Sequence, residues 1–314
     1  MRLDHRVLAS ALALALVGAG TVVPRAQQAE FTNNFRYNKG QSIQPIFEGW
    51  SWAPDGSINM HFGYLNRNYA ETPEIPVGPN NRIEPGGPDR GQPTFFYTRT
   101  NRNLFTVNVP RTWGQKDEVV WTLVHNEKTE RAVGWLQPEW EIDPVGGASG
   151  GGNTDPERTA NTAPTVAVSP VPGVRLPSDV TLVANLTDDG LPVPKKRGKP
   201  PVGQETPPTL LGGTDAPVNV PQAAPRETPP GATAGPDARP LGLVVSWMVW
   251  RGPGPVTFMP RYAPNADGKA ETKATFSVPG EYVLRATADD SMATAITTVT
   301  VRVSGGASTT GQPR

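Results

Sequence analysis

The chain has 314 residues with 29 basic and 29 acidic side chains, so its formal net charge at pH 7 is zero. A balanced charge gives no electrostatic footprint for nucleic acid, so we expect no nucleic-acid partner. The lack of cysteine excludes disulfides and thiolate metal sites, and stability must therefore come from an apolar core.

Residues 1–26 have the pattern of an export signal. Arg2 and Arg6 form a short basic region, and an apolar run from Val7 to Val17 follows it. The run is too short to anchor the chain across a bilayer, and we expect cleavage after Ala26. The alternatives are a membrane anchor or a buried helix. Export predicts a periplasmic, cell-surface or extracellular protein with no membrane span after signal removal.

Proline and glycine divide the rest of the chain into segments. The Gly-rich stretch 144–162 predicts a flexible linker. The proline-rich stretch 193–240 has almost no apolar periodicity, so we expect a disordered insertion, and residues 305–314 predict a disordered tail. Two patterned regions remain, 35–143 and 163–304.

The first region, 35–143, alternates with the period of a β-strand. Apolar side chains recur at every second position from Ile58 to Tyr64, and again from Phe105 to Val109 and from Val119 to Leu123. Asn126-Glu127-Lys128 predicts a short hairpin turn. We expect a compact antiparallel β-domain with a long proline-rich loop between Pro73 and Pro93.

The second region, 163–304, repeats this pattern. The clearest segment alternates from Ala274, turns at Pro279-Gly280, and alternates again up to Ala288. Seven short strands with turn residues between them predict an immunoglobulin-like sandwich. The whole chain is thus expected to be all-β, with two β-sandwich-like domains.

Several segments of the second region occur in the order found in one known family. They are Ala163-Pro164-Thr165-Val166, Thr187-Asp188-Asp189-Gly190, Val245-Ser246-Trp247, Gly252-Pro253-Gly254-Pro255 and 274–290. In this order they resemble the polycystic-kidney-disease (PKD) type of immunoglobulin-like domain of exported bacterial proteins. The resemblance implies a seven-stranded sandwich with Trp247 in the core, used as a spacer or in binding proteins and carbohydrates. The insertion 193–240 departs from the family, which has a short loop there.

The first region also resembles a known type of domain. Residues 62–68, 75–81, 89–94 and 136–140 are similar to an uncharacterised domain of exported proteins from environmental bacteria. This resemblance implies no particular activity.

Tryptophan supplies the best binding signal in the first region. The weak candidates for ligand contact are Trp50, Trp52, Trp135 and Trp140. Exposed aromatic faces suit stacking with sugars, but a domain without disulfides also needs large side chains in its core. Alternation in Trp50-Ser51-Trp52 places both indoles on one strand face.

Catalytic and metal-binding patterns are weaker. Gly147-Ala148-Ser149-Gly150-Gly151 matches the G-x-S-x-G motif but lies in the linker, without the strand and helix that a nucleophile elbow needs. Glu139 and Glu141 flank Trp140, and alternation would put both acids on one strand face, with Trp140 in the core on the other. His61 and His125 lack a recognisable triad or zinc spacing. We predict no catalytic residue, no metal site and no cofactor.

Four acids at predicted strand ends leave one ion site open. Asp188, Asp189, Asp289 and Asp290 could together bind calcium, but they lack the spacing of a calcium loop, and aspartate in a turn commonly bonds its own backbone.

These patterns predict a non-enzymatic exported protein of a bacterial surface or periplasm. The expected partner is a surface polysaccharide or another extracytoplasmic protein. The alternatives are a carbohydrate-binding accessory protein and a hydrolase in the first region that uses Glu139 or His125.

Overall fold

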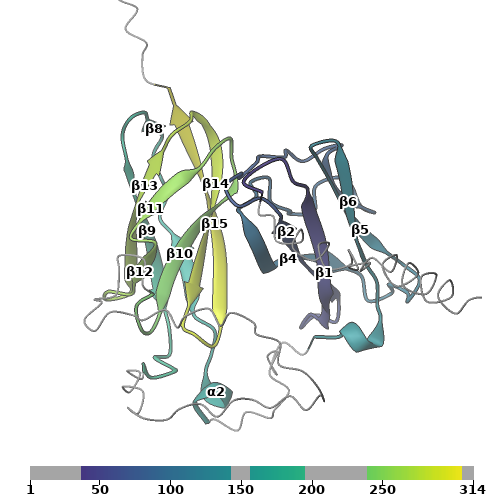
Figure 1. The fold of residues 1–314 in the computed structure, drawn as a ribbon. Helices are drawn as coiled ribbons and strands as arrows, with labels where there is room; N and C mark the ends of the chain where they lie inside the picture. The colour runs from purple at the N-terminus through teal and green to yellow at the C-terminus, as the bar shows by residue number, and fades with distance from the viewer. Residues whose placement is uncertain (1–36, 143–155, 195–238, 306–314) are drawn as a thin grey trace, which may run out of the picture.

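A computed structural model describes residues 37–142, 156–194 and 239–305 (Figure 1). Within these ranges the chain is nearly all β, with one short α-helix and one 3-10 turn, so the predicted all-β class is confirmed. The predicted export signal, the tail after Gly305, and most of the predicted linker and insertion lie outside the described residues.

The first sandwich consists of two antiparallel sheets of three strands each, in the orders β1-β2-β4 and β3-β5-β6. The strands are β1 Ile43–Trp52, β2 Ile58–Asn66, β3 Asn81–Glu84, β4 Arg99–Val109, β5 Val119–His125 and β6 Lys128–Gly134.

Alternation explains the core of this sandwich. The inward side chains of β2, from Ile58 to Tyr64, are fully buried and face Trp121 of β5. Asn126 and Glu127 both have positive φ, 51° and 61°, which gives the tight two-residue turn between β5 and β6.

Buried amide side chains hold the long segment between β2 and β4. Asn66 donates to Glu71 O and Phe96 O, at 2.9 and 3.2 Å. Asn81 donates to Ile75 O and Pro93 O, and its Oδ1 accepts the indole N–H of Trp121 at 3.0 Å. These bonds replace a regular ladder, so the backbone of the segment is fixed even though only β3 lies within it.

The second sandwich has nine strands in two sheets, in the orders β7-β9-β13-β11 and β8-β15-β14-β10-β12. The strands are β7 Thr165–Val168, β8 Val174–Arg175, β9 Val180–Thr187, β10 Val244–Arg251, β11 Val256–Met259, β12 Tyr262–Pro264, β13 Lys269–Phe276, β14 Gly280–Asp289 and β15 Thr294–Ser304.

This strand order is that of an immunoglobulin-like sandwich. Strands β7, β9, β13 and β11 take the places of A, B, E and D, and β10, β14 and β15 take those of C, F and G. Strand β8 pairs in parallel with β15, so the first strand changes sheets. The nine strands exceed the predicted seven because the first strand and the edge strand are each divided between the two sheets.

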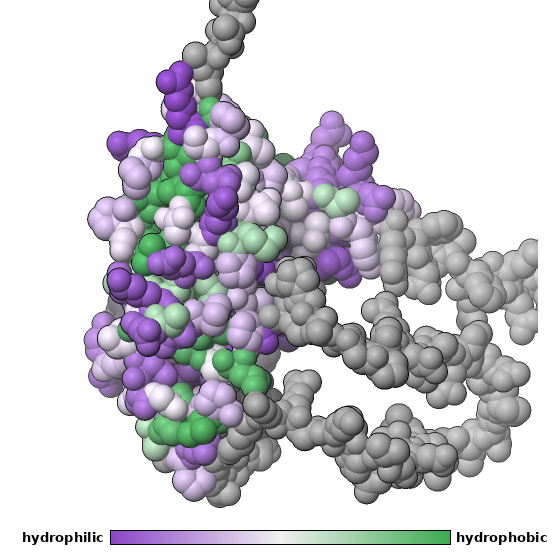
Figure 2. All heavy atoms as spheres, turned by 90° about the vertical axis from the view of Figure 1, so that its left-hand side faces the viewer, coloured by the Kyte–Doolittle hydropathy of each residue, from purple (hydrophilic) through white to green (hydrophobic). Residues whose placement is uncertain are grey.

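The inner side chains of both sheets form one core that includes Trp247. On the face of this sandwich seen in Figure 2, hydrophilic and apolar side chains interleave. Mixed exposure of this kind is typical of a sheet whose alternate residues face solvent.

The two sandwiches exchange aromatic side chains. Trp250 of β10 is 5% exposed and belongs to the core of the first sandwich, where its ring centroid lies 6.1 Å from that of Phe105. Phe95, from the segment before β4, is 2% exposed and belongs to the core of the second sandwich. Each core is therefore completed by a residue of the other sandwich.

Polar contacts surround these two side chains. Arg251 forms a two-pronged ion pair with Asp89, at 2.9 and 2.8 Å, and also donates to Gln92 O. The pair lowers the pKa of Asp89, chiefly through the hydrogen bond from Arg251. The backbone N–H of Val249 donates to Tyr97 Oη at 2.8 Å. The two sandwiches thus share a specific interface in addition to their covalent connection.

The end of the predicted linker is attached to the second sandwich. Helix α2, Pro156–Ala160, precedes Asn161 and Thr162, whose side chains bond to Asp290 and Asp189. No helix among the described residues is long and apolar enough to cross a membrane.

Candidate ligand-binding surface

The four candidate tryptophans gather at one place on the first sandwich. Trp50 and Trp52 end β1, Trp135 follows β6, and Trp140 ends the 3-10 turn η3, Pro138–Trp140. The indole N–H of Trp50 donates to Gln137 O at 2.8 Å, which ties the end of β1 to this turn. We call Trp50, Trp52, Trp135 and Trp140 the tryptophan cluster.

Within the cluster, Trp50 and Trp52 differ in exposure. Trp50 is 6% exposed, whereas Trp52 is 48% exposed, and their rings meet edge to face at 5.7 Å. Trp52 pairs with Ile58 at the end of the sheet, where the inner face of β1 extends beyond the core. Trp50 therefore forms the buried base of the cluster, and the indole of Trp52 faces solvent.

Trp140 forms the second exposed part of the cluster. It is 39% exposed, and its ring centroid lies 5.4 Å from Phe47 and 5.4 Å from Trp135. Close backbone contact places it there, because a Cβ on Gly49 would lie 2.5 Å from Trp140 O. Gly49 has a φ of +127°, a conformation that side chains with a Cβ rarely adopt.

The expected strand through Glu139, Trp140 and Glu141 is wrong. Pro138 opens the turn η3, in which the N–H of Glu141 donates to Pro138 O at 3.2 Å. Proline lacks the N–H that a ladder needs, and its fixed φ suits the first position of a turn. The expected core position of Trp140 is wrong for the same reason, since the turn brings its side chain to the surface.

A shallow cavity of about 360 Å³ lies beside Trp140. Its charged lining consists of Glu48, Arg102, Glu139 and Glu141. Glu48 Oε1 lies 3.7 Å from Arg102 Nε, and its other oxygen accepts the backbone N–H of Asn103. An indole beside several carboxylates and one guanidinium can stack on a ring and hydrogen-bond its hydroxyl groups. Sequence analysis missed Glu48 and Arg102 because β1 and β4 approach each other only in the folded sheet.

The two histidines of the described chain lie in other surroundings. His61 Nε2 lies 2.8 Å from Ser51 Oγ on the outer face of the β1–β2 pair. In the described part of the chain no carboxylate bonds to the other nitrogen of His61, and Ser51 is only 3% exposed. A triad needs both an orienting acid and an accessible nucleophile. His125 ends β5, in the other sheet of this sandwich, and its Nε2 lies 3.3 Å from Glu71 Oε1.

His61 gives a pH-dependence that can be measured. Burial lowers its pKa below the usual 6.5, so the folded state resists protonation more than the unfolded state. Above pH 6.5 the ring is neutral in both states. As the pH falls below 6.5, only the unfolded state gains the proton, and the free energy of unfolding should fall by at most about 1.4 kcal/mol per pH unit.

Urea unfolding of the protein and of His61→Gln at several pH values between 7.5 and 5 checks this expectation. The variant should lose less stability over this range. Equal pH slopes for the two proteins would contradict the assignment to His61.

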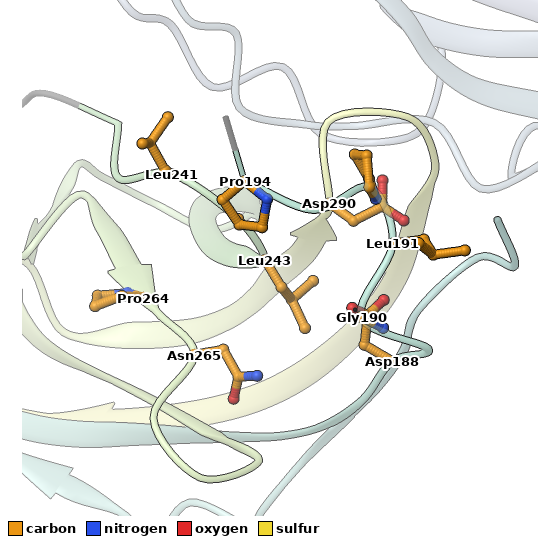
Figure 3. Close-up of a pocket in the computed structure, with 11 residues that line it drawn as sticks. Asp188, Gly190, Leu191, Pro194, Leu241, Leu243, Pro264, Asn265 and Asp290 are labelled. Atoms are coloured by element: carbon orange, nitrogen blue, oxygen red, sulfur yellow. Dashed lines mark hydrogen bonds between the residues drawn. The ribbon is translucent and has the colours of Figure 1, made fainter. Parts of the chain in front are cut away.

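Two of the four strand-end acids of the second sandwich, Asp188 and Asp290, line a pocket of about 270 Å³. Figure 3 shows Asp188 and Asp290 on one side of this pocket and Asn265 on the other. Burial raises the pKa of Asp188, with help from the nearby Asp189 and Asp290 charges.

The oxygens of these acids already hold the backbone and nearby side chains. Asp290 accepts the N–H groups of Met292 and Ala293, both at 2.6 Å. Asp189 accepts from Thr162 and from the backbone of Leu191, while Asp289 accepts from Ser291 and pairs with Arg239. Among the described residues no group of three or more His, Cys, Asp or Glu side chains is arranged to hold a metal ion. These aspartates act as turn caps.

Comparison with known proteins identifies no family. No family model matches the chain, and no curated protein matches its sequence. Among solved structures it is similar to the titin domains Z1Z2 in complex with telethonin, with 10% identity, a TM-score of 0.24, and coverage of 84% of this chain and 98% of that one. It is also similar to domains 4–9 of the surface layer protein SbsC, with 9% identity, a TM-score of 0.24, and coverage of 85% of this chain but 31% of that one.

Proposed function

We propose that this protein is an exported, non-enzymatic binding module of a bacterial surface or periplasm. The first sandwich carries recognition through the tryptophan cluster, and the PKD-like second sandwich serves as its rigid support or spacer. The observation that carries this proposal is the exposure of Trp52 and Trp140 above a buried layer formed by Trp50 and Phe47. Solvent-facing indoles cost hydrophobic free energy, which contact with a ligand would recover.

Carbohydrate is the ligand class that this surface favours. A sugar ring presents an apolar face for an indole and hydroxyl groups for carboxylates, and the cavity beside Trp140 offers both kinds of contact. The cavity is open and shallow, which suits a polysaccharide chain better than a small enclosed ligand.

Glycan binding by point variants tests this function. We expect the purified protein to bind at least one polysaccharide on a glycan array, and Trp140→Ala and Trp52→Ala each to weaken binding by about tenfold, because an aromatic stacking contact is worth about 1 kcal/mol beyond its buried area. Tyr37→Ala is the matched control, since Tyr37 is 53% exposed and lies outside the cluster. Unchanged glycan binding in both tryptophan variants would remove the proposal for this surface.

The hydrolase alternative has weaker support. Glu139 lies in the exposed turn η3, whereas His125 ends β5 in the other sheet and contacts Glu71. Among the described residues no contact joins these two candidates. General acid-base catalysis needs its groups within reach of one substrate atom.

A further inference from the structure

Strand β15 leaves a long stretch of its backbone at the edge of the second sandwich. On one side it pairs with β14 in an unbroken antiparallel register, and the two strands run side by side in Figure 1. On its other side it pairs with β8 only at Val303 and Ser304. From Thr294 to Val301, β15 therefore has no partner strand on that side within the described ranges. We call Thr294–Val301 the open edge.

Two hydrogen bonds fix which backbone groups of the open edge face outward. At one end, Ser304 O accepts the N–H of Leu176, which follows β8, so Ser304 faces away from β14. At the other end, the N–H of Asp290 bonds to Ala293 O across the turn, so the next residue, Thr294, also faces away from β14. Alternation between these two points turns the same four N–H and C=O pairs outward, those of Thr294, Ile296, Thr298 and Thr300. We find no hydrogen bond to these groups from any described residue.

The open edge also lacks the features that normally prevent a sheet edge from pairing. Natural edges are kept short, charged, bulged or interrupted by proline. The opposite edge of the same sheet, β12, has three residues and ends at Pro264. The open edge contains no proline and no charged residue, its register with β14 has no bulge, and every residue except Ala295 is β-branched. Ile296 on its outer face is 49% exposed. It is therefore a ready template for another strand.

A second copy of the same edge fits this template. When two open edges run antiparallel about a two-fold axis at Thr297, Thr294 lies opposite Thr300 of the second copy, and Ile296 lies opposite Thr298. Each of these residues then exchanges both N–H···O bonds with its counterpart, so every outward group is satisfied. No charged side chains meet, because the open edge has none, and the zero net charge of the chain gives no overall repulsion between copies.

We propose that the protein forms a two-fold symmetric dimer in which two open edges pair antiparallel about Thr297. The pairing joins two five-stranded sheets into one continuous sheet. It uses the open edge of both copies, so assembly closes at two chains. The contact is small, which favours a reversible dimer with a dissociation constant in the micromolar range. It lies on the second sandwich and does not depend on the function proposed for the tryptophan cluster.

Sedimentation equilibrium of the full chain tests whether the dimer forms. We expect the mass of one chain at about 0.1 µM and a mass approaching that of two chains at about 200 µM. A single chain at every concentration, or species that grow beyond two chains, would overturn the proposal.

Two double variants test the pairing of Ile296 with Thr298. Both side chains are exposed, so their replacement should leave the fold intact. Ile296→Lys with Thr298→Lys places like charges directly opposite each other across the axis and should weaken dimerisation by about tenfold. Ile296→Lys with Thr298→Glu is the matched control, because the same two positions then bring opposite charges together and the dimer should be retained. Equal dissociation constants for the two double variants would count against this interface.

Cysteine cross-linking tests the position of the axis, since the chain has no cysteine of its own. Thr297→Cys places two thiols opposite each other across the axis, at a Cα separation of about 4.5 Å, which suits a disulfide. We expect this variant to form a covalent dimer on mild oxidation. Thr300→Cys is the matched control, because its thiols would lie about 20 Å apart along the strands. Failure of Thr297→Cys to cross-link, or equally efficient cross-linking of Thr300→Cys, would contradict the proposed register.

Discussion

Replacing Trp250 with alanine should destabilise the protein by about 3–5 kcal/mol, the usual cost of removing a large buried aromatic side chain. Its indole fills the core of the first sandwich although its backbone belongs to β10 of the second. The ring N–H donates to Gly91 O at 3.2 Å, and the guanidinium of Arg285 lies 3.6 Å from the ring centroid. The substitution leaves a cavity and also removes the aromatic partner of a half-buried cation.

Arg285 raises the cost of that substitution. Burial lowers the pKa of Arg285 to about 10, and its Nη1 donates a hydrogen bond to Leu104 O of the first sandwich. A half-buried charge that loses one of its partners destabilises the fold. We therefore expect the interface to separate in the Trp250→Ala variant before either sandwich unfolds.

Urea unfolding followed by fluorescence and by limited proteolysis measures this effect. The unmodified protein should unfold in one cooperative transition, and the variant in two. Trp52→Ala is the matched control, since its indole is half exposed, and it should cost under about 1 kcal/mol. A loss below about 1 kcal/mol in Trp250→Ala, with one transition retained, would show that the indole does not join the two sandwiches.

Asn81→Leu should lower the free energy of unfolding by at least about 3 kcal/mol, because it leaves buried polar groups without hydrogen-bond partners. The amide of Asn81 satisfies Ile75 O, Pro93 O and the indole N–H of Trp121, all inside the first sandwich. Leucine fills a similar volume but leaves these three groups without a partner, and each buried unpaired group costs about 1–3 kcal/mol.

The neighbouring residue provides the control for this variant. Asn80 is exposed, so Asn80→Leu should change the free energy of unfolding by less than about 0.5 kcal/mol. Denaturant unfolding gives the stabilities, and near-UV circular dichroism reports the surroundings of Trp121. Similar stabilities for the two variants would mean that the amide of Asn81 is not a structural anchor.

Periodicity predicted the regular part of this fold well. The alternating residues of β2, β5 and β14 are the buried ones, because one face of each sheet packs against its partner sheet. Periodicity could not predict the segment between β2 and β4, since its backbone is held by side-chain amides such as Asn66 and Asn81, which carry no period.

The exchange of Trp250 and Phe95 was equally hidden from sequence analysis. Both residues have the apolar character of any core position, and residue type does not reveal which of two cores a side chain enters. The exposure of the candidate tryptophans was also hidden from the sequence. Trp50 and Trp52 share a strand face, yet only the end of the sheet decides which of them is exposed.

The interlocking of Trp250 and Phe95 has a consequence for multivalent ligands. Two binding domains joined by a flexible linker sample many separations, and their combined affinity for a multivalent ligand depends on linker length. Here the shared cores hold the tryptophan cluster at a fixed position relative to the second sandwich. Any avidity between the cluster and a contact on the second sandwich would thus be governed by the span and stiffness of the ligand, and inserting residues between positions 142 and 156 would leave it unchanged.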